Sequence, residues 1–267
     1  GNLTLQGYSY AASGSGRGVD LNNDVIAASG TVSMTGQHNT GATYALSLSG
    51  STSITAGTGV TLESLNNNTG TIALLSSGGI NGGSGTVLMR AANYAFGGAD
   101  RTITTTGVLT IQPDADENSF ASSFDNQYLN PVNVTGLTLG KSSNASAITL
   151  SRAISLSGPV SIYGGSIDVN ANITANSGNI LLDADTGSTL NQSSTGILLD
   201  DAITIETVTS CNLTLIGRSG DTGSGFDGID ASSANTTTLR SAGNLTLQGY
   251  SYAASGSGRG VDLNNDV

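Results

Sequence analysis

The chain has 267 residues, of which 37% are hydrophobic, 10% charged and only 4% aromatic, and it includes 38 Gly and no Trp. So few large side chains would poorly fill an ordinary globular core, while this apolar content excludes a chain that is disordered by composition. The net charge of −11 argues against a basic nucleic-acid-binding surface, the single Cys211 excludes an intrachain disulfide, and no apolar run reaches the ~18 residues of a membrane helix.

Short alternations of apolar and polar residues recur along the whole chain, with many β-branched residues and no helical stripe. This pattern predicts β-strands. In chain order, the predicted strands are centred on residues 3–5, 32–34, 45–48, 60–62, 108–111, 137–139, 148–150, 160–162, 167–169, 203–205 and 213–215. Many of these strands are followed by Gly, which supplies the tight turns of corners between strands.

The opening segment of the chain recurs without change at its end. Residues 1–25 read GNLTLQGYSYAASGSGRGVDLNNDV, and residues 243–267 repeat this string letter for letter. An identity of this length does not arise by chance, and internal repeats indicate a stacked architecture. We therefore interpret residues 1–242 as one full period of a tandem array and residues 243–267 as the start of the next identical period.

A shorter and degenerate repeat lies inside the period. Residues 211–230 (CNLTLIGRSGDTGSGFDGID) align with residues 243–262 (GNLTLQGYSYAASGSGRGVD). A unit of this size has too little apolar surface to fold alone, so it must stack on its neighbours. The expected fold class is therefore all-β, a parallel β-helix (β-solenoid) of irregular coils that recur every ~15–30 residues.

One stretch differs from this alternating pattern: residues 112–133 (QPDADENSFASSFDNQYLNPVN). It holds two of the three prolines, half of the phenylalanines and a group of acidic residues, which predicts a loop excursion from the solenoid. Two interpretations remain open: a recognition loop, or a corner that covers an apolar gap. The residues of this candidate binding loop are Asp114, Asp116, Glu117, Phe120, Phe124 and Tyr128.

The NLTL–Gly units, the run from Ile154 to Ile173 and its continuation from Thr174 to Leu182 resemble the filamentous-haemagglutinin-type exoproteins. These are very long, two-partner-secreted bacterial adhesins with tandem β-solenoid repeats. The resemblance implies a right-handed β-helix outside the cell, at the bacterial surface. It implies a role in adhesion, biofilm or cell–cell cohesion.

Catalytic and metal-binding residues are sparse. His38 is the only His and lies in the polar stretch 37–40, which predicts a surface turn, and carboxylate pairs such as Asp114 and Asp116 have few basic partners. We therefore expect no enzyme, catalytic residue or cofactor. Weak calcium-ligand candidates, spaced like oxygen ligands, are Asp20, Asn22 and Asp24, with Asp227 and Asp230 in a Gly-rich segment; corner aspartates that cap turns are the alternative.

The function expected from these observations is a structural or adhesive repeat of a long secreted surface fibre. Its expected partners are identical repeats joined end to end, with other fibres or surface glycans as further candidates, and neither nucleic acid nor a membrane span is expected. The alternative is a β-helix enzyme acting on polysaccharides, or a carbohydrate-binding solenoid like that of a tail spike.

Overall fold

The computed structural model describes residues 1–10, 16–38, 44–65, 70–75, 78–184, 194–200, 202–220, 225–231, 236–252 and 255–263. Throughout these residues the regular elements are β-strands that pair in parallel, as in β1 (Leu3–Ser9) with β4 (Val32–His38). The fold is the parallel β-helix that the sequence predicts, and it is right-handed, as connections between parallel strands almost always are. No helix in the described part of the chain could cross a membrane.

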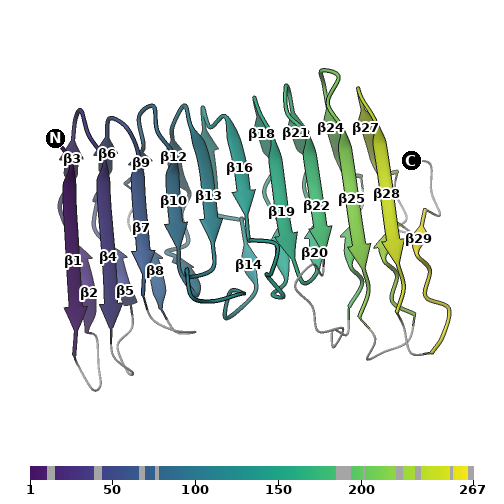
Figure 1. The fold of residues 1–267 in the computed structure, drawn as a ribbon, viewed down its shortest axis with the longest axis horizontal. Helices are drawn as coiled ribbons and strands as arrows, with labels where there is room; N and C mark the ends of the chain where they lie inside the picture. Colours follow the sequence, from purple (N-terminus) through teal and green to yellow (C-terminus); the bar gives the residue numbers. More distant parts are fainter. Residues whose placement is uncertain are drawn as a thin grey trace. The chain divides into compact units, whose positions relative to one another are not determined.

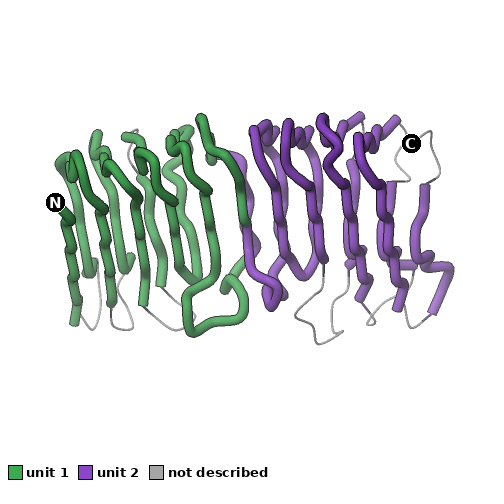
Figure 2. The backbone as a smooth tube through the Cα atoms, turned by 45° about the horizontal axis from the view of Figure 1, so that its top comes forward, with its two compact units in different colours: residues 1–122, 128–138 green, residues 123–127, 139–267 purple. Residues whose placement is uncertain are grey.

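The chain divides into two compact units, coloured separately in Figure 2. Unit 1 comprises Gly1–Ser122 and Tyr128–Thr138, and unit 2 comprises Ser123–Gln127 and Leu139–Val267. Strand β16 (Gly136–Leu139) contains the residues at which the chain passes from unit 1 to unit 2. Each unit has three parallel faces, and each coil of the chain contributes one strand to a face in turn.

In unit 1, strands that are next to each other in a face are one coil apart in the sequence (Figure 1). The first face contains β1, β4, β7 (Val60–Ser64), β10 (Val87–Arg90) and β13 (Val108–Gln112). The second face contains β2 (Arg17–Leu21), β5 (Tyr44–Leu48), β8 (Thr71–Leu74) and β11 (Asn93–Phe96). The third face contains β3 (Val25–Ala27), β6 (Ile54–Ala56), β9 (Ile80–Asn81), β12 (Arg101–Thr104) and β15 (Leu129–Val132).

Unit 2 repeats this arrangement with its own strands. Its first face contains β19 (Val160–Gly164), β22 (Ile180–Ala184), β25 (Leu213–Arg218) and β28 (Leu245–Tyr250). The second face contains β14 (Phe124–Asp125), β17 (Ile148–Leu150), β20 (Ile167–Val169), β23 (Ile197–Leu199), β26 (Ile229–Asp230) and β29 (Val261–Asp262). The third face contains β18 (Ile154–Leu156), β21 (Ile173–Ala175), β24 (Thr204–Thr207) and β27 (Thr238–Ser241).

The core consists of inward-facing aliphatic residues that stack from coil to coil. Val32 pairs with Val60 and Val60 with Val87, and all three are buried, whereas the neighbouring Ser33 and Thr61 face outward and are half-buried. Burial of one such side chain contributes about 1.5–3 kcal/mol. A row of small aliphatic residues therefore replaces the aromatic core that this sequence lacks.

The coils differ in length, as the register of the first face shows. Leu3 pairs with Val32 in the next coil, Val160 pairs with Ile180, and Ile180 pairs with Leu213. Of these three coils, the one that begins at Val160 is the shortest and the one that begins at Ile180 is the longest. The strands keep their register despite these differences, so the coils differ in the number of residues between paired strands. This explains why the repeat in the sequence is irregular while the ladders are not.

The two copies of the duplicated segment adopt the same elements where both are described. β1 begins at Leu3 and β28 at the equivalent Leu245, while β29 repeats the centre of β2. The Arg17–Asp20 ion pair of the first copy recurs in the second as Arg259–Asp262. The internal repeat is also confirmed, because Leu213 pairs with Leu245, the residue with which it aligns in the sequence.

Candidate functional site

Glycines bring the first and second faces into backbone contact at one corner of the β-helix. A Cβ atom on Gly7 would overlap the carbonyl group of Gly18, and a Cβ atom on Gly249 would overlap that of Gly260, the same pair in the second copy. Strand β1 continues beyond this point, which places Tyr8 on the outward side of the strand. The duplicated segment therefore carries a projecting strand end in both of its copies.

The strand ends beyond Gly7 line an open recess of about 300 Å³. It is formed by Tyr8 and Ser9 at the end of β1, by the next residue Tyr10, and by Gln37 and His38 at the end of β4. The pairing of β1 with β4 places Tyr8 opposite Gln37 and Ser9 opposite His38, and the two tyrosines are 53% and 83% exposed. Exposed phenol rings beside amide, hydroxyl and imidazole groups can stack on an apolar ring face and hydrogen-bond to hydroxyls at its rim.

The second copy shows what lies on the other side of the same tyrosines. Tyr250 and Tyr252, equivalent to Tyr8 and Tyr10, stack with ring centroids 6.5 Å apart and an interplanar angle of 18°. The guanidinium of Arg218 on β25 lies over the Tyr250 ring, 5.7 Å from its centroid, and forms an ion pair of 3.0 Å with Asp183. A cation over a ring face adds about 0.5–1 kcal/mol at an exposed site.

His38 does not lie in a surface turn, as its polar neighbours suggested. It is the last residue of β4 and is only 5% exposed. The reason is the alternation along β4, because Met34, Gly36 and His38 follow one another on the inward side of the strand. The polar stretch therefore begins as a strand, and residues 39–40 lie outside the described part of the chain.

The tyrosines of this recess were not among the residues that sequence reasoning selected. A signal was present, because four of the eight tyrosines, Tyr8, Tyr10, Tyr250 and Tyr252, lie in the duplicated segment. Their exposure follows from the glycine contact, which lets the strand continue beyond the core. The close approach of the two backbones depends on tertiary packing, so the sequence positions of Gly7 and Gly18 alone do not predict it.

The irregular stretch predicted at residues 112–133 is shorter in the structure and spans residues 113–123. Gln112 ends β13, Phe124 begins β14, and residues 129–132 form β15, in which Leu129 pairs with Arg101 of β12. Pro131 misled the sequence interpretation, because proline normally excludes a strand. It is tolerated here because β15 ends the row of strands in its face, where a missing N–H interrupts no further ladder.

The aromatic residues of the candidate binding loop point inward. Phe120 and Phe124 are buried, and the Phe120 ring packs edge-on against Tyr94 with centroids 5.9 Å apart. Tyr128 is half-buried, and its carbonyl oxygen accepts a 2.7 Å hydrogen bond from the backbone N–H of Arg101. This geometry favours the interpretation in which the segment covers an apolar gap.

The acidic residues of the same segment have different environments. Asp114 is buried, and its burial, together with the charge of Glu63, raises the pKa of its carboxyl group. The backbone N–H of Glu117 donates a 3.1 Å hydrogen bond to the carbonyl of Asp114, which closes a turn, while Asp116 is exposed. Of the six predicted loop residues, therefore, Asp116 is the one that presents an exposed side chain.

The calcium candidates Asp20, Asn22 and Asp24 are used within and between coils. Asp20 forms the ion pair with Arg17, Asn22 Oδ1 accepts a 2.5 Å hydrogen bond from the Ser49 hydroxyl, and Asp24 Oδ1 accepts a 2.8 Å bond from the backbone N–H of Ser53. Asn22 and Asp24 therefore connect one coil to the next, while Asp20 pairs within its own strand, in agreement with the turn-capping alternative.

Asp227 and Asp230 do come together, and Asp262 of the duplicated segment joins them. One carboxylate oxygen from each lies within 4.8 Å of the others. Burial is the main cause that raises the pKa of Asp227, with the charges of Asp230 and Asp262 adding to it. Arg259 offsets this repulsion, because its backbone N–H donates to Asp227 and its guanidinium pairs with Asp262. Carboxylate oxygens suit Ca²⁺, but these already have a cationic partner.

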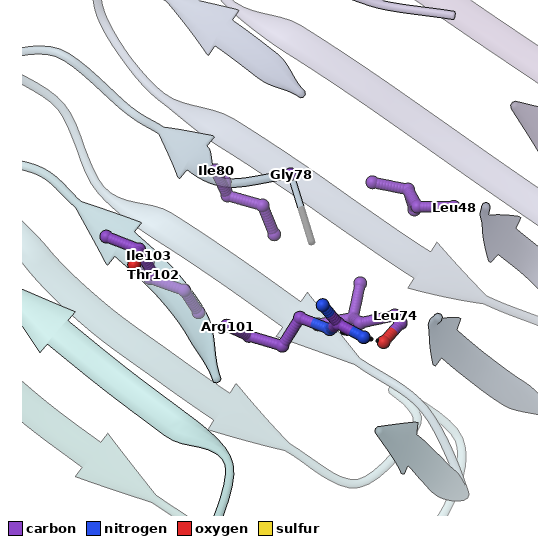
Figure 3. Close-up of a pocket in the computed structure, with 7 residues that line it drawn as sticks. All are labelled: Leu48, Leu74, Gly78, Ile80, Arg101, Thr102 and Ile103. Atoms are coloured by element: carbon purple, nitrogen blue, oxygen red, sulfur yellow. Dashed lines mark hydrogen bonds between the residues drawn. The ribbon is translucent and has the colours of Figure 1, made fainter. Parts of the chain in front are cut away.

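Within unit 1, a small cavity lies beside the buried Arg101 (Figure 3). Its volume is about 10 Å³, roughly the room needed by one water molecule. The cavity is lined by Leu48, Leu74, Gly78, Ile80, Arg101, Thr102 and Ile103. Nε of Arg101 donates a 2.5 Å hydrogen bond to the carbonyl of Leu74, the last residue of β8.

Comparison with known proteins gave no match: no family model, no curated protein and no solved structure is similar to the chain.

Proposed function

We propose that the chain is a structural and adhesive repeat of a long bacterial surface fibre, non-catalytic and of the filamentous-haemagglutinin type. In this proposal the protein is extracellular and its partners are identical periods stacked end to end. The observation that carries the proposal is the duplicated coil, which has the same backbone elements and the same Arg–Asp ion pair in both copies.

The two copies together display both neighbours of one coil. In the first copy, Leu3 of β1 pairs with Val32 of the coil that follows. In the second copy, the equivalent Leu245 of β28 pairs with Leu213 of the coil that precedes. The same coil can therefore accept a neighbour on each side in register. This is what an uninterrupted array of periods requires.

A ladder of asparagine side chains supports the same conclusion. The backbone N–H of Asn212 donates to Asn179 Oδ1, and that of Asn244 donates to Asn212 Oδ1, both at 2.9 Å. Asn2, the equivalent of Asn244, accepts at Oδ1 a 3.1 Å hydrogen bond from the backbone N–H of Thr31. Joining the two copies gives a ladder from Asn179 to Thr31 that passes through the boundary between periods without a break.

Electron microscopy of a chain with two consecutive periods would test this proposal. We expect thin particles whose length increases with the number of periods. The matched control replaces the duplicated segment at the internal boundary with a flexible Gly–Ser linker of equal length, and it should show two separately oriented bodies. Two independent bodies in the unmodified chain would contradict the proposal.

A second candidate function, binding of a surface carbohydrate, is favoured by the tyrosine recess. Tyr8 and Tyr10 offer exposed ring faces, and Gln37 offers both a donor and an acceptor beside them. In an array, the Arg218 equivalent would lie on the other side of the same rings. This arrangement would occur once in every period, so many weak sites on one fibre would act together.

A glycan-binding screen of residues 1–267 would test this second candidate. The double variant Tyr8→Ala/Tyr10→Ala should lose binding, because both ring faces are removed. Tyr163→Ala, on β19 of unit 2, is a control that lies outside the recess. Equal loss of binding in both variants, or binding that survives in the double variant, would exclude the recess as the carbohydrate site.

A further inference from the structure

Arg101 occupies a buried position at the start of β12, and its neighbours in the ladder are small or apolar. Ile103 pairs with Ile80, so Arg101 is in register with Gly78 one coil earlier, and it pairs with the buried Leu129 one coil later. A Cβ atom on Gly78 would overlap the carbonyl group of Thr52, so the backbone leaves no room for a side chain there. The Arg101 side chain extends toward the end of β8, where Leu74 accepts its hydrogen bond (Figure 3).

The guanidinium of Arg101 is buried with an uncompensated charge. The residue is 3% exposed, its Nη1 atom has no hydrogen-bond partner, and none of the described carboxylates forms an ion pair with it. Burial lowers the pKa of Arg101, but a guanidinium stays protonated in a protein at neutral pH. A buried cation without a counter-ion is costly. Five other arginines, by contrast, each pair with a carboxylate: Arg17, Arg90, Arg218, Arg240 and Arg259.

We propose that the cavity beside Arg101 binds one small monovalent anion of the chloride class, which serves as the counter-ion of the guanidinium. Leu48, Leu74, Ile80 and Ile103 give the cavity mainly apolar walls. A water molecule requires two to four polar partners and would carry no charge, so it would leave the cation uncompensated. The volume of about 10 Å³ favours a single small ion over a polyatomic anion.

Thermal unfolding of the chain in sodium chloride and in sodium gluconate, at equal ionic strength, would test the proposal. The melting temperature should increase by roughly 3–5 °C for each tenfold rise in chloride above the dissociation constant, and gluconate should have no such effect. Arg101→Met should remove this response, because the charge is lost while the cavity stays apolar. Arg240→Met is the matched control, since its side chain is 70% exposed and should leave the chloride response intact.

A direct measurement on the unmodified protein keeps the proposal testable if Arg101→Met does not fold. A crystal grown in bromide should show an anomalous scattering peak within ~3–4 Å of Arg101 Nη1, the range of an ion pair. A water molecule at that position without anomalous signal would overturn the proposal. So would a chloride response that is the same in Arg101→Met and Arg240→Met.

Discussion

Single glycines determine how closely two faces of the β-helix approach each other. Gly36 of β4 pairs with Gly7 in the preceding coil and with Ser64 in the following one. A Cβ atom on Gly36 would overlap the carbonyl oxygen of Ala45, a backbone atom that cannot move aside without disturbing β5. At Ser64, one coil later, the same position of the ladder accommodates a side chain.

These neighbouring positions give a matched pair of substitutions. Gly36→Ala should lower the free energy of unfolding by about 1–3 kcal/mol, because the added methyl group overfills a backbone contact. Ser64→Ala should be neutral or slightly stabilising, since the buried Ser64 hydroxyl has no hydrogen-bond partner among the described residues. Urea unfolding of the two variants would measure the difference, and equal losses would show that the contact is not tight.

At the scale of elements, the segment 113–123 connects β13 to β14 and covers the core with the buried Phe120 ring. Phe120 lies against Tyr94, whose hydroxyl donates a 2.9 Å hydrogen bond to the carbonyl of Gln112. Burial raises the pKa of this Tyr94 hydroxyl well above its ordinary value, so it remains a donor at any physiological pH. Tyr94 therefore contacts the segment through the Phe120 ring and also hydrogen-bonds to Gln112, the residue just before the segment.

Substitutions in segment 113–123 can distinguish a segment that covers an apolar gap from a loop that recognises a partner. Phe120→Ala should lower the free energy of unfolding by about 3–5 kcal/mol, because it empties a buried aromatic site. Asp116→Asn, at an exposed position, should change the free energy of unfolding by no more than ~0.5 kcal/mol. If Asp116→Asn instead abolished binding to a cell or glycan, the recognition interpretation would regain support.

The corner where β26 meets β29 allows a test of the calcium hypothesis. Arg259 already compensates Asp227 and Asp262, so we expect the melting temperature to be unchanged when calcium is added or a chelator is present. Asp230→Asn should then raise the melting temperature slightly, by removing one of three mutually repelling carboxylates. A calcium-dependent increase that disappears in Asp230→Asn would establish a calcium site instead.

Strands were predictable from sequence wherever alternation and repetition agreed. The pairing of Leu213 with Leu245 follows directly from the repeated letters, and Val32 and Val60 follow from apolar alternation. The inward orientation of His38 and the strand around Pro131 were missed, because each depends on a neighbouring coil. The Asp227–Asp230–Asp262 cluster was predicted only in part, since Asp262 reaches it through stacking.

At the scale of the whole molecule, buried carboxyl groups make the stability of the protein depend on pH. Burial is the main cause that raises the pKa of Asp114, Asp168, Asp183 and Asp227. The folded form therefore binds more protons than the unfolded form between the ordinary carboxyl pKa of 3.8 and these raised values. In that range, the free energy of unfolding increases as the pH falls.

We therefore expect a higher melting temperature at mildly acidic pH, near 5, than at pH 7.5. The cost of ionising these buried carboxyls is fully present at neutral pH and is relieved as the pH falls through their raised pKa values. Asp227→Asn should reduce this dependence on pH. A series of thermal melts would check both points, and a melting temperature that falls steadily from pH 7.5 to 5 would contradict the assignment.

The asparagine ladder also gives the stack a direction. Each hydrogen bond runs from a backbone N–H to the Oδ1 atom of the preceding coil, as in Asn244 to Asn212. At this ladder, the side of a coil that faces the following coil offers the Asn Oδ1 acceptor and the opposite side offers the backbone N–H, so two like sides are not complementary there. Contacts between such surfaces are heterologous and do not close on themselves, unlike a two-fold interface. In the fibre that we propose, growth would consequently be polar, and the two tips would differ chemically.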